Sequence, residues 1–261
     1  MSSIALCCNV YNDAHALRGL MESGARFFDN IFILHAGPGG AHSTDGTIEL
    51  AEKFGATLKY DDIERGFGAV RTRLIHECGC EWAFILDADE RFFPQINVMR
   101  CEGTDRYPNP LEPKLTVRHE KEIIDQGGQL KDWISDPDLM AIRSTRRHWF
   151  DFAMRRPGEN WEIIWDHQLR IVRNVRDIEF SLKMHEQLWD NRTGKTPKFR
   201  CQDPVGGPFH DHFHLAFRLA YPGTKEWNEE QYARLNRGEK MLVKGKEADG
   251  PEAGNPTGTT S

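Results

Sequence analysis

The chain has 261 residues, of which 39% are hydrophobic and 28% are charged, and its formal net charge at pH 7 is −6. This length is enough for one large domain with a full hydrophobic core, and the composition is that of an ordinary globular protein. The negative net charge argues against broad, nonspecific binding to nucleic acid, although it allows a local basic patch.

The cysteines and the amino terminus indicate a compartment. The six cysteines show neither the spacing of paired disulfides nor a CxxC zinc pattern, which favours a reducing environment. The amino terminus has no basic stretch before its short apolar run, and no segment approaches the roughly 18 apolar residues of a membrane helix. We therefore expect a cytoplasmic protein without a membrane span.

Strands and helices alternate over the first 90 residues. The sequence predicts four strands, at residues 4–10, 31–34, 56–60 and 82–86, and the apolar runs at 31–34 and 82–86 predict buried ones. The sequence predicts a helix that follows and is capped by the turn Tyr11-Asn12-Asp13, a second helix that Ser43-Thr44-Asp45 caps and that runs to about residue 54, and a third over 67–77. A glycine-rich loop, 35–42, precedes the second helix and would let backbone approach a ligand closely. The alternation indicates an α/β fold with a parallel, doubly wound sheet.

The pattern changes after residue 90. Residues 94–136 lack a clean period and indicate an excursion with some helix around 120–130. The remaining predicted elements are strands at 139–144 and 163–172, a short strand or bend at 177–183, and helices at 213–220 and 226–242. Residues 245–261 contain almost no apolar side chain and predict a disordered tail.

Residues 82–90 form an apolar run that ends in three carboxylates within four residues. A strand buried on both faces would place these acids at its carboxyl end, where open α/β sheets bind ligands. Asp87 and Asp89 are two residues apart, so on an extended strand they share a face, and their repulsion has to be offset by a cation or a proton. The pattern predicts a hard divalent metal here. A strand or turn cap is the alternative that so short a motif leaves open.

Several segments, in this order, resemble the family 2 glycosyltransferases with the GT-A fold, in particular short cytosolic members with a late His-Glu motif. They are Asn9-Val10-Tyr11-Asn12-Asp13, Ser43-Thr44-Asp45-Gly46-Thr47, Gly68-Ala69-Val70-Arg71-Thr72, residues 82–90, His167-Gln168-Leu169-Arg170-Ile171-Val172-Arg173-Asn174 and Met184-His185-Glu186. The resemblance implies one Rossmann-like GT-A domain over 1–244, with a mostly parallel sheet between helices. Residues 1–92 would be its nucleotide-sugar-binding half, and 93–244 its acceptor half.

The resemblance also implies roles for single residues. The family binds a nucleotide-diphospho-sugar, usually linked to UDP, and its Asp-x-Asp motif holds Mn²⁺ or Mg²⁺ against the diphosphate. Asp89 would be a direct metal ligand, and Asp87 would lie on the ribose or on metal-bound water. Arg71 would lie near the diphosphate, where a cation stabilises the charge on the leaving phosphate. The expected contacts of the nucleoside are Tyr11, Asn12, Asp13 and Asp45. His35 departs from the family, which usually has an acid there.

Two further assignments concern the second half. An inverting transfer needs a base to remove the acceptor's proton, and the resemblance places the His-Glu pair at the catalytic centre, so Glu186 is the expected base and Asp166 the reserve candidate. Alternatively, Glu186 forms an ion pair with Arg170 or Arg173. Histidines alternate over residues 210–214, which places them on one face of an extended segment. Imidazole often binds Mn²⁺-like metals beside carboxylates, and we expect His212 to be the next metal ligand.

Cations and aromatic residues alternate between residues 143 and 156, where the acceptor would dock. Such a run is either a solvated surface or a site for an acidic or stacked acceptor, such as a modified base in DNA or a phosphorylated glycan. The sequence thus predicts a metal-dependent, inverting glycosyltransferase that moves a sugar from a UDP-sugar to a hydroxyl of a glycan, protein or modified nucleic acid. Two alternatives stay open: a noncatalytic nucleotide-sugar-binding module, and a nucleotidyltransferase. The latter normally has a glycine-rich phosphate loop with a lysine where this chain has Tyr11-Asn12-Asp13-Ala14.

Overall fold

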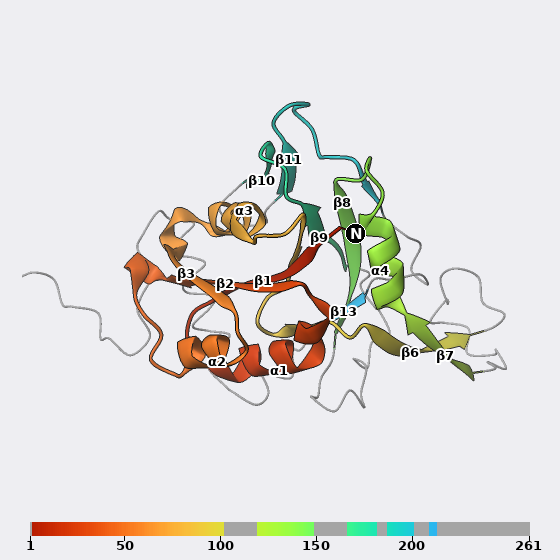
Figure 1. The fold of residues 1–261 in the computed structure, drawn as a ribbon, viewed down its shortest axis with the longest axis horizontal. Helices are drawn as coiled ribbons and strands as arrows, with labels where there is room; N and C mark the ends of the chain where they lie inside the picture. Colours follow the sequence, from red (N-terminus) through yellow and green to blue (C-terminus); the bar gives the residue numbers. More distant parts are fainter. Residues whose placement is uncertain (1, 102–118, 149–165, 182–186, 201–208, 213–261) are drawn as a thin grey trace, which may run out of the picture.

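A mixed β-sheet forms the centre of the computed structural model, which describes residues 2–101, 119–148, 166–181, 187–200 and 209–212 (Figure 1). The strand order is β3-β2-β1-β4-β9-β8-β13-β5, and β12 also pairs with β8. Most pairings are parallel; β4 with β9, β9 with β8, and β13 with β5 are antiparallel. The strands are β1 (Ile4–Val10), β2 (Asn30–Gly37), β3 (Thr57–Asp62), β4 (Trp82–Ile85), β5 (Glu90–Arg91), β8 (Ala141–His148), β9 (Asp166–Arg173), β12 (Phe199–Arg200) and β13 (Phe209–His212).

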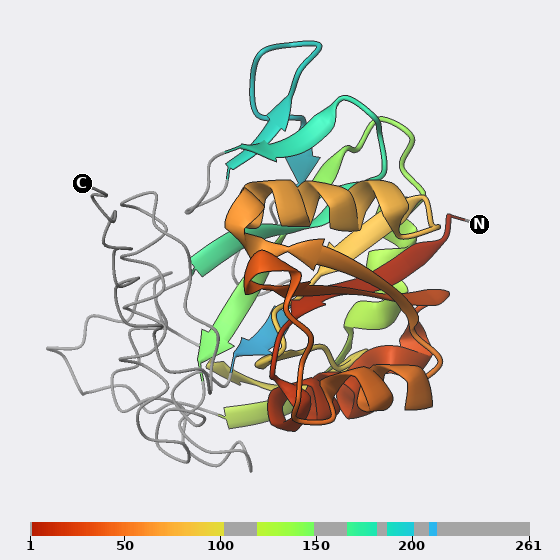
Figure 2. The same cartoon turned by 90° about the vertical axis from the view of Figure 1, so that its left-hand side faces the viewer.

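Helices cover both faces of this sheet, as the side view in Figure 2 shows. Helices α1 (Ala14–Gly24) and α2 (Thr47–Lys53) lie on one face, and α3 (Phe67–Glu77) lies on the other (Figure 1). Two antiparallel pairs lie outside the sheet: β6 (Gln95–Cys101) with β7 (His119–Asp125), and β10 (Ile178–Ser181) with β11 (Gln187–Asp190). Helix α4 (Gln126–Ile134) follows β7. The expected α/β class, with a Rossmann-like and mostly parallel sheet between helices, is confirmed.

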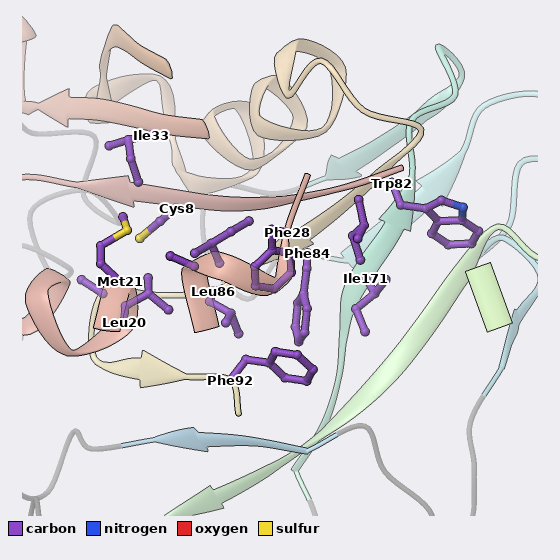
Figure 3. Packing of buried hydrophobic residues seen from close by; sticks show 14 of the residues in the cluster. Cys8, Leu20, Met21, Phe28, Ile33, Trp82, Phe84, Leu86, Phe92 and Ile171 are labelled. Atoms are coloured by element: carbon purple, nitrogen blue, oxygen red, sulfur yellow. The ribbon is translucent and has the colours of Figure 1, made fainter. Parts of the chain in front are cut away.

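The core has two halves because the strands in the middle of the sheet are buried on both faces. On β1, Leu6 and Cys8 belong to the cluster under α1 and α2, whereas Cys7 belongs to the cluster under α3. Figure 3 shows the first cluster, in which the rings of Phe28, Phe84 and Phe92 meet. The ring centroids of Phe84 and Phe92 are 5.2 Å apart. This two-sided burial is the physical reason for the unbroken apolar runs in the sequence.

The strand directions bring distant segments to one edge of the sheet. β8 and β13 run parallel to each other, and both run antiparallel to β9, which is itself antiparallel to β4. The carboxyl ends of β1, β4, β8 and β13 therefore lie at the same edge as the start of β9. The acids after β4, the end of β8, Asp166 and His212 all come from this edge.

The predicted elements of the first half agree well with the structure. The strand at 4–10 and the helix at 67–77 have the observed bounds. The expected end of β2 at residue 34 is wrong, because pairing with β3 continues through His35 opposite Tyr60 to Gly37 opposite Asp62. The predicted loop is therefore shorter, and Gly39 and Gly40 supply its left-handed backbone, with φ of 59° and 74°.

The excursion after residue 94 is more regular than predicted. Residues 119–125 form strand β7 rather than helix, because they pair with β6 along its whole length. The helix starts only at Gln126, where Asp125 caps it by accepting a hydrogen bond from the Gly128 N–H (3.0 Å).

Among the described residues, none of the helices combines the length and the apolar character needed to cross a membrane. The predicted helices at 213–220 and 226–242 and the tail at 245–261 lie outside the described residues.

Candidate functional site

The three carboxylates after β4 belong to Asp87, Asp89 and Glu90. They lie on a tight turn at residues 87–90, which we call the acid turn. β4 ends at Ile85, the Glu90 N–H donates to the Asp87 carbonyl (2.9 Å), and the Asp87 N–H donates to Glu90 Oε2 (2.9 Å). The expectation that Asp87 and Asp89 share a face of one strand is therefore wrong, because the chain has left the sheet before Asp87. The structure shows different partners for the two side chains.

Asp87 lies between two arginines. Arg71 Nη2, from α3, is 2.8 Å from Asp87 Oδ1, and Arg170 Nη2, from β9, is 2.9 Å from Oδ2. Burial acts to raise the pKa of Asp87, but the positive charges of Arg170 and Arg71 outweigh it and hold the pKa below its ordinary value. These guanidinium groups thus supply charge compensation that the sequence argument had assigned to a metal or a proton.

Glu90 is the best-buried acid of the site, with none of its side chain exposed. Its Oε1 is 3.0 Å from Arg170 Nη2 and 3.1 Å from Arg146 Nη2, the latter from β8. Arg146 Nη2 also donates to Gln168 Oε1 (2.6 Å). Sequence reasoning missed this network, although a third acid directly after an apolar strand was a signal that could have drawn attention to Glu90.

Asp89 points to a different partner. His212 Nε2 is 3.4 Å from Asp89 Oδ2, and both side chains are mostly covered, with 13% and 22% exposed. Backbone pairing produces this approach, because His212 of β13 lies opposite Glu90 of β5 and also pairs with β8. Two of the residues predicted to bind a metal thus come together from distant parts of the chain.

The Asp89 carboxylate and the His212 imidazole could supply some, but not all, of the ligands of a divalent cation. A carboxylate and an imidazole suit Mn²⁺-like ions, and Mg²⁺ is usually held by one or two carboxylates together with substrate phosphates. No cluster of three or more histidine, cysteine or acidic side chains occurs within the described ranges. A metal at Asp89 and His212 would therefore complete its coordination with water or phosphate.

Two loops join at the carboxyl ends of β1 and β2. The Asn12 N–H donates to Ser43 Oγ (2.8 Å), and the Asp13 N–H donates to Thr47 Oγ1 (2.9 Å). Asn12 has a left-handed backbone, with φ of 52°, so this turn is held in an uncommon conformation for a side-chain-bearing residue. The loops therefore form one hydrogen-bonded unit beside the acid turn.

The start of α1 depends on the second loop. We expected the Tyr11-Asn12-Asp13 turn to cap α1, but the Asp13 side chain makes no capping hydrogen bond there. Asp45 Oδ2 accepts from the Ala14 N–H instead (3.0 Å). Burial acts to raise the pKa of Asp45, but hydrogen bonds from Thr47 and Ala14 lower it overall. Asp45 is thus an ionised acid held by both loops.

A group of rings lies beside these loops. His35 is buried, its ring lies edge-on to Tyr11, and Ser43 donates its N–H to His35 Nε2 (3.0 Å). The rings of His42 and Tyr60 lie 4.9 Å apart with an interplanar angle of 32°, and Tyr60 is 46% exposed. Rings so placed can stack on a planar ligand.

Folding should depend on pH through His35. Burial, assisted by His42, lowers the pKa of His35 in the folded protein. Below about pH 6.5 the unfolded chain therefore takes up a proton that the folded chain does not, so stability is present above that pH and falls as the pH drops towards the folded-state pKa. His35→Gln, which keeps an acceptor for Ser43, should flatten this fall in urea unfolding measured between about pH 5 and pH 8.

The chain has ten other histidines, so the comparison needs a reference. His76→Gln replaces an exposed histidine on α3 whose Nε2 is 3.0 Å from the Ile178 carbonyl oxygen. The control should keep the pH slope of the wild type. Equal slopes for His35→Gln and the wild type would show that His35 does not contribute.

Several predicted site residues lie where the structure gives no side-chain description. Glu186, His185 and His214 are outside the described residues, and Asp166 is described only as the first backbone residue of β9. Of the basic run at 143–156, Arg143 lies over the Phe199 ring, with its Cζ 4.3 Å from the ring centroid, and Arg146 binds Glu90. These two arginines are therefore engaged within the protein.

Comparisons with known proteins give remote likenesses. No family model matches the chain. A TPR repeat-containing protein of Synechococcus elongatus is 22% identical over 191 residues, which are 73% of this chain and 36% of that protein. The chain thus spans about a third of this curated relative.

Two solved structures are also similar at low identity. S. aureus TarS 1–349 in complex with UDP has a TM-score of 0.46 and 13% identity, over 81% of this chain and 60% of that chain. The mannosyltransferase PcManGT from Pyrobaculum calidifontis, in complex with GDP-Man and Mn²⁺, has a TM-score of 0.36 and 16% identity, over 56% of this chain and 36% of that chain.

Proposed function

We propose that the protein is a metal-dependent, inverting GT-A glycosyltransferase that moves a sugar from a UDP-sugar to a hydroxyl acceptor. The observation that carries the proposal is the meeting of Asp89 with His212, 3.4 Å apart, beside the Arg71–Asp87–Arg170 cluster. One edge of the sheet thereby offers a carboxylate and an imidazole, both of a kind that can bind a metal, together with arginine cations. A nucleoside diphosphate leaving group needs both kinds of charge.

The residues divide this work between them. Asp89 and His212 would hold Mn²⁺ or Mg²⁺, which when bound neutralises charge on the diphosphate. Arg71 has 14% of its side chain exposed, so it can turn from Asp87 to a phosphate oxygen. Asp87 would then contact the ribose or metal-bound water. These assignments agree with the motif resemblance of residues 82–90.

The joined loops are the proposed nucleoside site. Tyr11 and its neighbouring rings provide flat surfaces for a base, and Asn12, Asp13 and Asp45 provide hydrogen-bonding groups. These loops are already fixed to each other by the bonds to Ser43 and Thr47. Binding would therefore cost little loop ordering.

The acceptor half supplies the base. Glu186 is the proposed residue that removes the proton from the acceptor hydroxyl, with Asp166 as the reserve candidate. Asp166 opens β9 at the same edge of the sheet as the acid turn. The acceptor would be a glycan, a protein or a modified nucleic acid, which a screen for transfer from the preferred donor would identify.

UDP should bind only with a divalent cation present. Asp89→Ala and His212→Ala each remove a proposed metal-binding side chain. Loss of an outer-shell partner of a metal lowers affinity by about 10- to 100-fold, so loss of a direct ligand should weaken Mn²⁺-dependent UDP binding by more than that. Calorimetric titration of UDP, with Mn²⁺ or with a chelator, measures this.

Asp132→Ala, an exposed acid on α4, is the control and should bind UDP like the wild type. UDP affinity that a chelator leaves unchanged would contradict the metal site. Release of free UDP from a panel of UDP-sugars then tests transfer chemistry, whereas release of pyrophosphate from UTP and a sugar phosphate, with a UDP-sugar as product, would point to a nucleotidyltransferase.

A further inference from the structure

Glu90 is the buried junction between the acid turn and two further strands. Its Oε1 meets Arg170 Nη2 at 3.0 Å and Arg146 Nη2 at 3.1 Å, while its Oε2 accepts from the Asp87 N–H at 2.9 Å. Arg170 and Arg146 are themselves 2% and 13% exposed. An acid fully out of water is costly unless each oxygen is paired, and here both oxygens are paired.

The junction also fixes the charge of the site. The guanidinium groups of Arg71, Arg146 and Arg170 are matched in number by the carboxylates of Asp87, Asp89 and Glu90. Asp87 and Glu90 each hold two of the arginines: Arg170 is common to both, and Glu90 also holds Arg146. Without its charge the cluster would carry a net positive charge next to the Asp89–His212 pair.

We propose that Glu90 is a positioning residue that makes the donor site accept a divalent cation. It holds Arg146 and Arg170 by their Nη2 groups and so prevents their charge from repelling a metal at Asp89 and His212. It also holds the Asp87 backbone, which fixes the turn that presents Asp89. The inference rests on the proposed function, because it concerns the same metal and diphosphate.

Glu90→Gln tests this in the full-length protein. Glutamine has nearly the same shape and can still accept from the Asp87 N–H, but it has no charge for the two arginines. The Mn²⁺ concentration for half-maximal UDP binding should rise about 10- to 100-fold. The affinity for UDP in a chelator should increase, because the freed positive charge attracts phosphate.

A loosened structure would weaken UDP binding both with Mn²⁺ and in a chelator. The proposed role instead predicts that Mn²⁺-dependent binding weakens while binding in a chelator strengthens. Glu77→Gln is the matched control: Glu77 also holds two cations, Arg73 at 2.6 Å and Lys59 at 2.8 Å, on the part of α3 away from Asp87. It should alter neither quantity. The double variant Glu90→Gln/Arg146→Gln removes one charge of each sign and should return both quantities towards wild type, which provides a second test if the single variant does not fold.

The outcomes separate the two proposals. If the wild type binds UDP only with Mn²⁺ but Glu90→Gln changes neither quantity, or weakens both, the role of Glu90 is overturned and the proposed function stands. If the wild type binds UDP equally well with Mn²⁺ and in a chelator, or binds no UDP under either condition, both proposals are overturned.

Discussion

Replacing Glu186 with glutamine should reduce turnover by about 10²-fold or more while UDP affinity stays close to that of the wild type. Glutamine keeps the size and hydrogen-bonding reach of the side chain but cannot take the proton of the attacking hydroxyl. The rate of UDP release from the preferred UDP-sugar measures turnover, and a calorimetric titration of UDP with Mn²⁺ measures affinity.

Asp166→Asn is the matched comparison, because it makes the same chemical change at the other candidate. It should retain most of the turnover. If Asp166→Asn loses turnover and Glu186→Gln keeps it, Asp166 is the base. Loss of UDP binding in Glu186→Gln would place that residue in the donor site instead.

The sequence predicts the first half of the fold well because β1, most of β2 and β4 are buried on both faces. The runs around Cys7 and Phe84 are apolar without interruption, and glycines or polar residues mark where they stop. Prediction was weaker where pairing between strands decides the structure. His35 is polar, yet it extends β2 because its backbone pairs with that of Tyr60 on β3. Residues 119–125, part of the predicted helix around 120–130, form strand β7 because their backbone pairs with that of β6.

The site shows the same division. Asp89 and His212 were both expected to bind a metal from their motifs, and their proximity depends on the pairing of β13 with β5, which the sequence does not reveal. The arginine cluster could not be predicted because Arg71, Arg146 and Arg170 come from three different elements. Their meeting at two carboxylates follows from the strand directions, not from any local pattern.

Arg170→Met should destabilise the protein by about 3 to 5 kcal/mol, the usual result of breaking a buried ion pair from one side. Arg170 Nη2 bridges Asp87 (2.9 Å) and Glu90 (3.0 Å), and its side chain is 2% exposed. Methionine fills much of the space but leaves the buried Glu90 with one cation fewer. The free energy of unfolding in urea, measured near neutral pH, gives the loss.

Two further variants show whether charge is the cause. In Arg170→Met/Glu90→Gln the uncompensated acid is gone. The double variant should therefore lose less unfolding free energy than the sum of the losses of the two single variants, and the difference, the coupling energy, should be about 0.5 to 3 kcal/mol. Arg65→Met breaks an ion pair with Asp61 in which the arginine is 58% exposed, and it should cost less than about 1 kcal/mol. The idea is contradicted if Arg170→Met loses no more unfolding free energy than Arg65→Met, or if the losses of Arg170→Met and Glu90→Gln are strictly additive. Either result would mean that Arg170 contributes packing that another side chain can replace, and not charge. The acid turn would then depend on Arg71 and Arg146 for its charge balance.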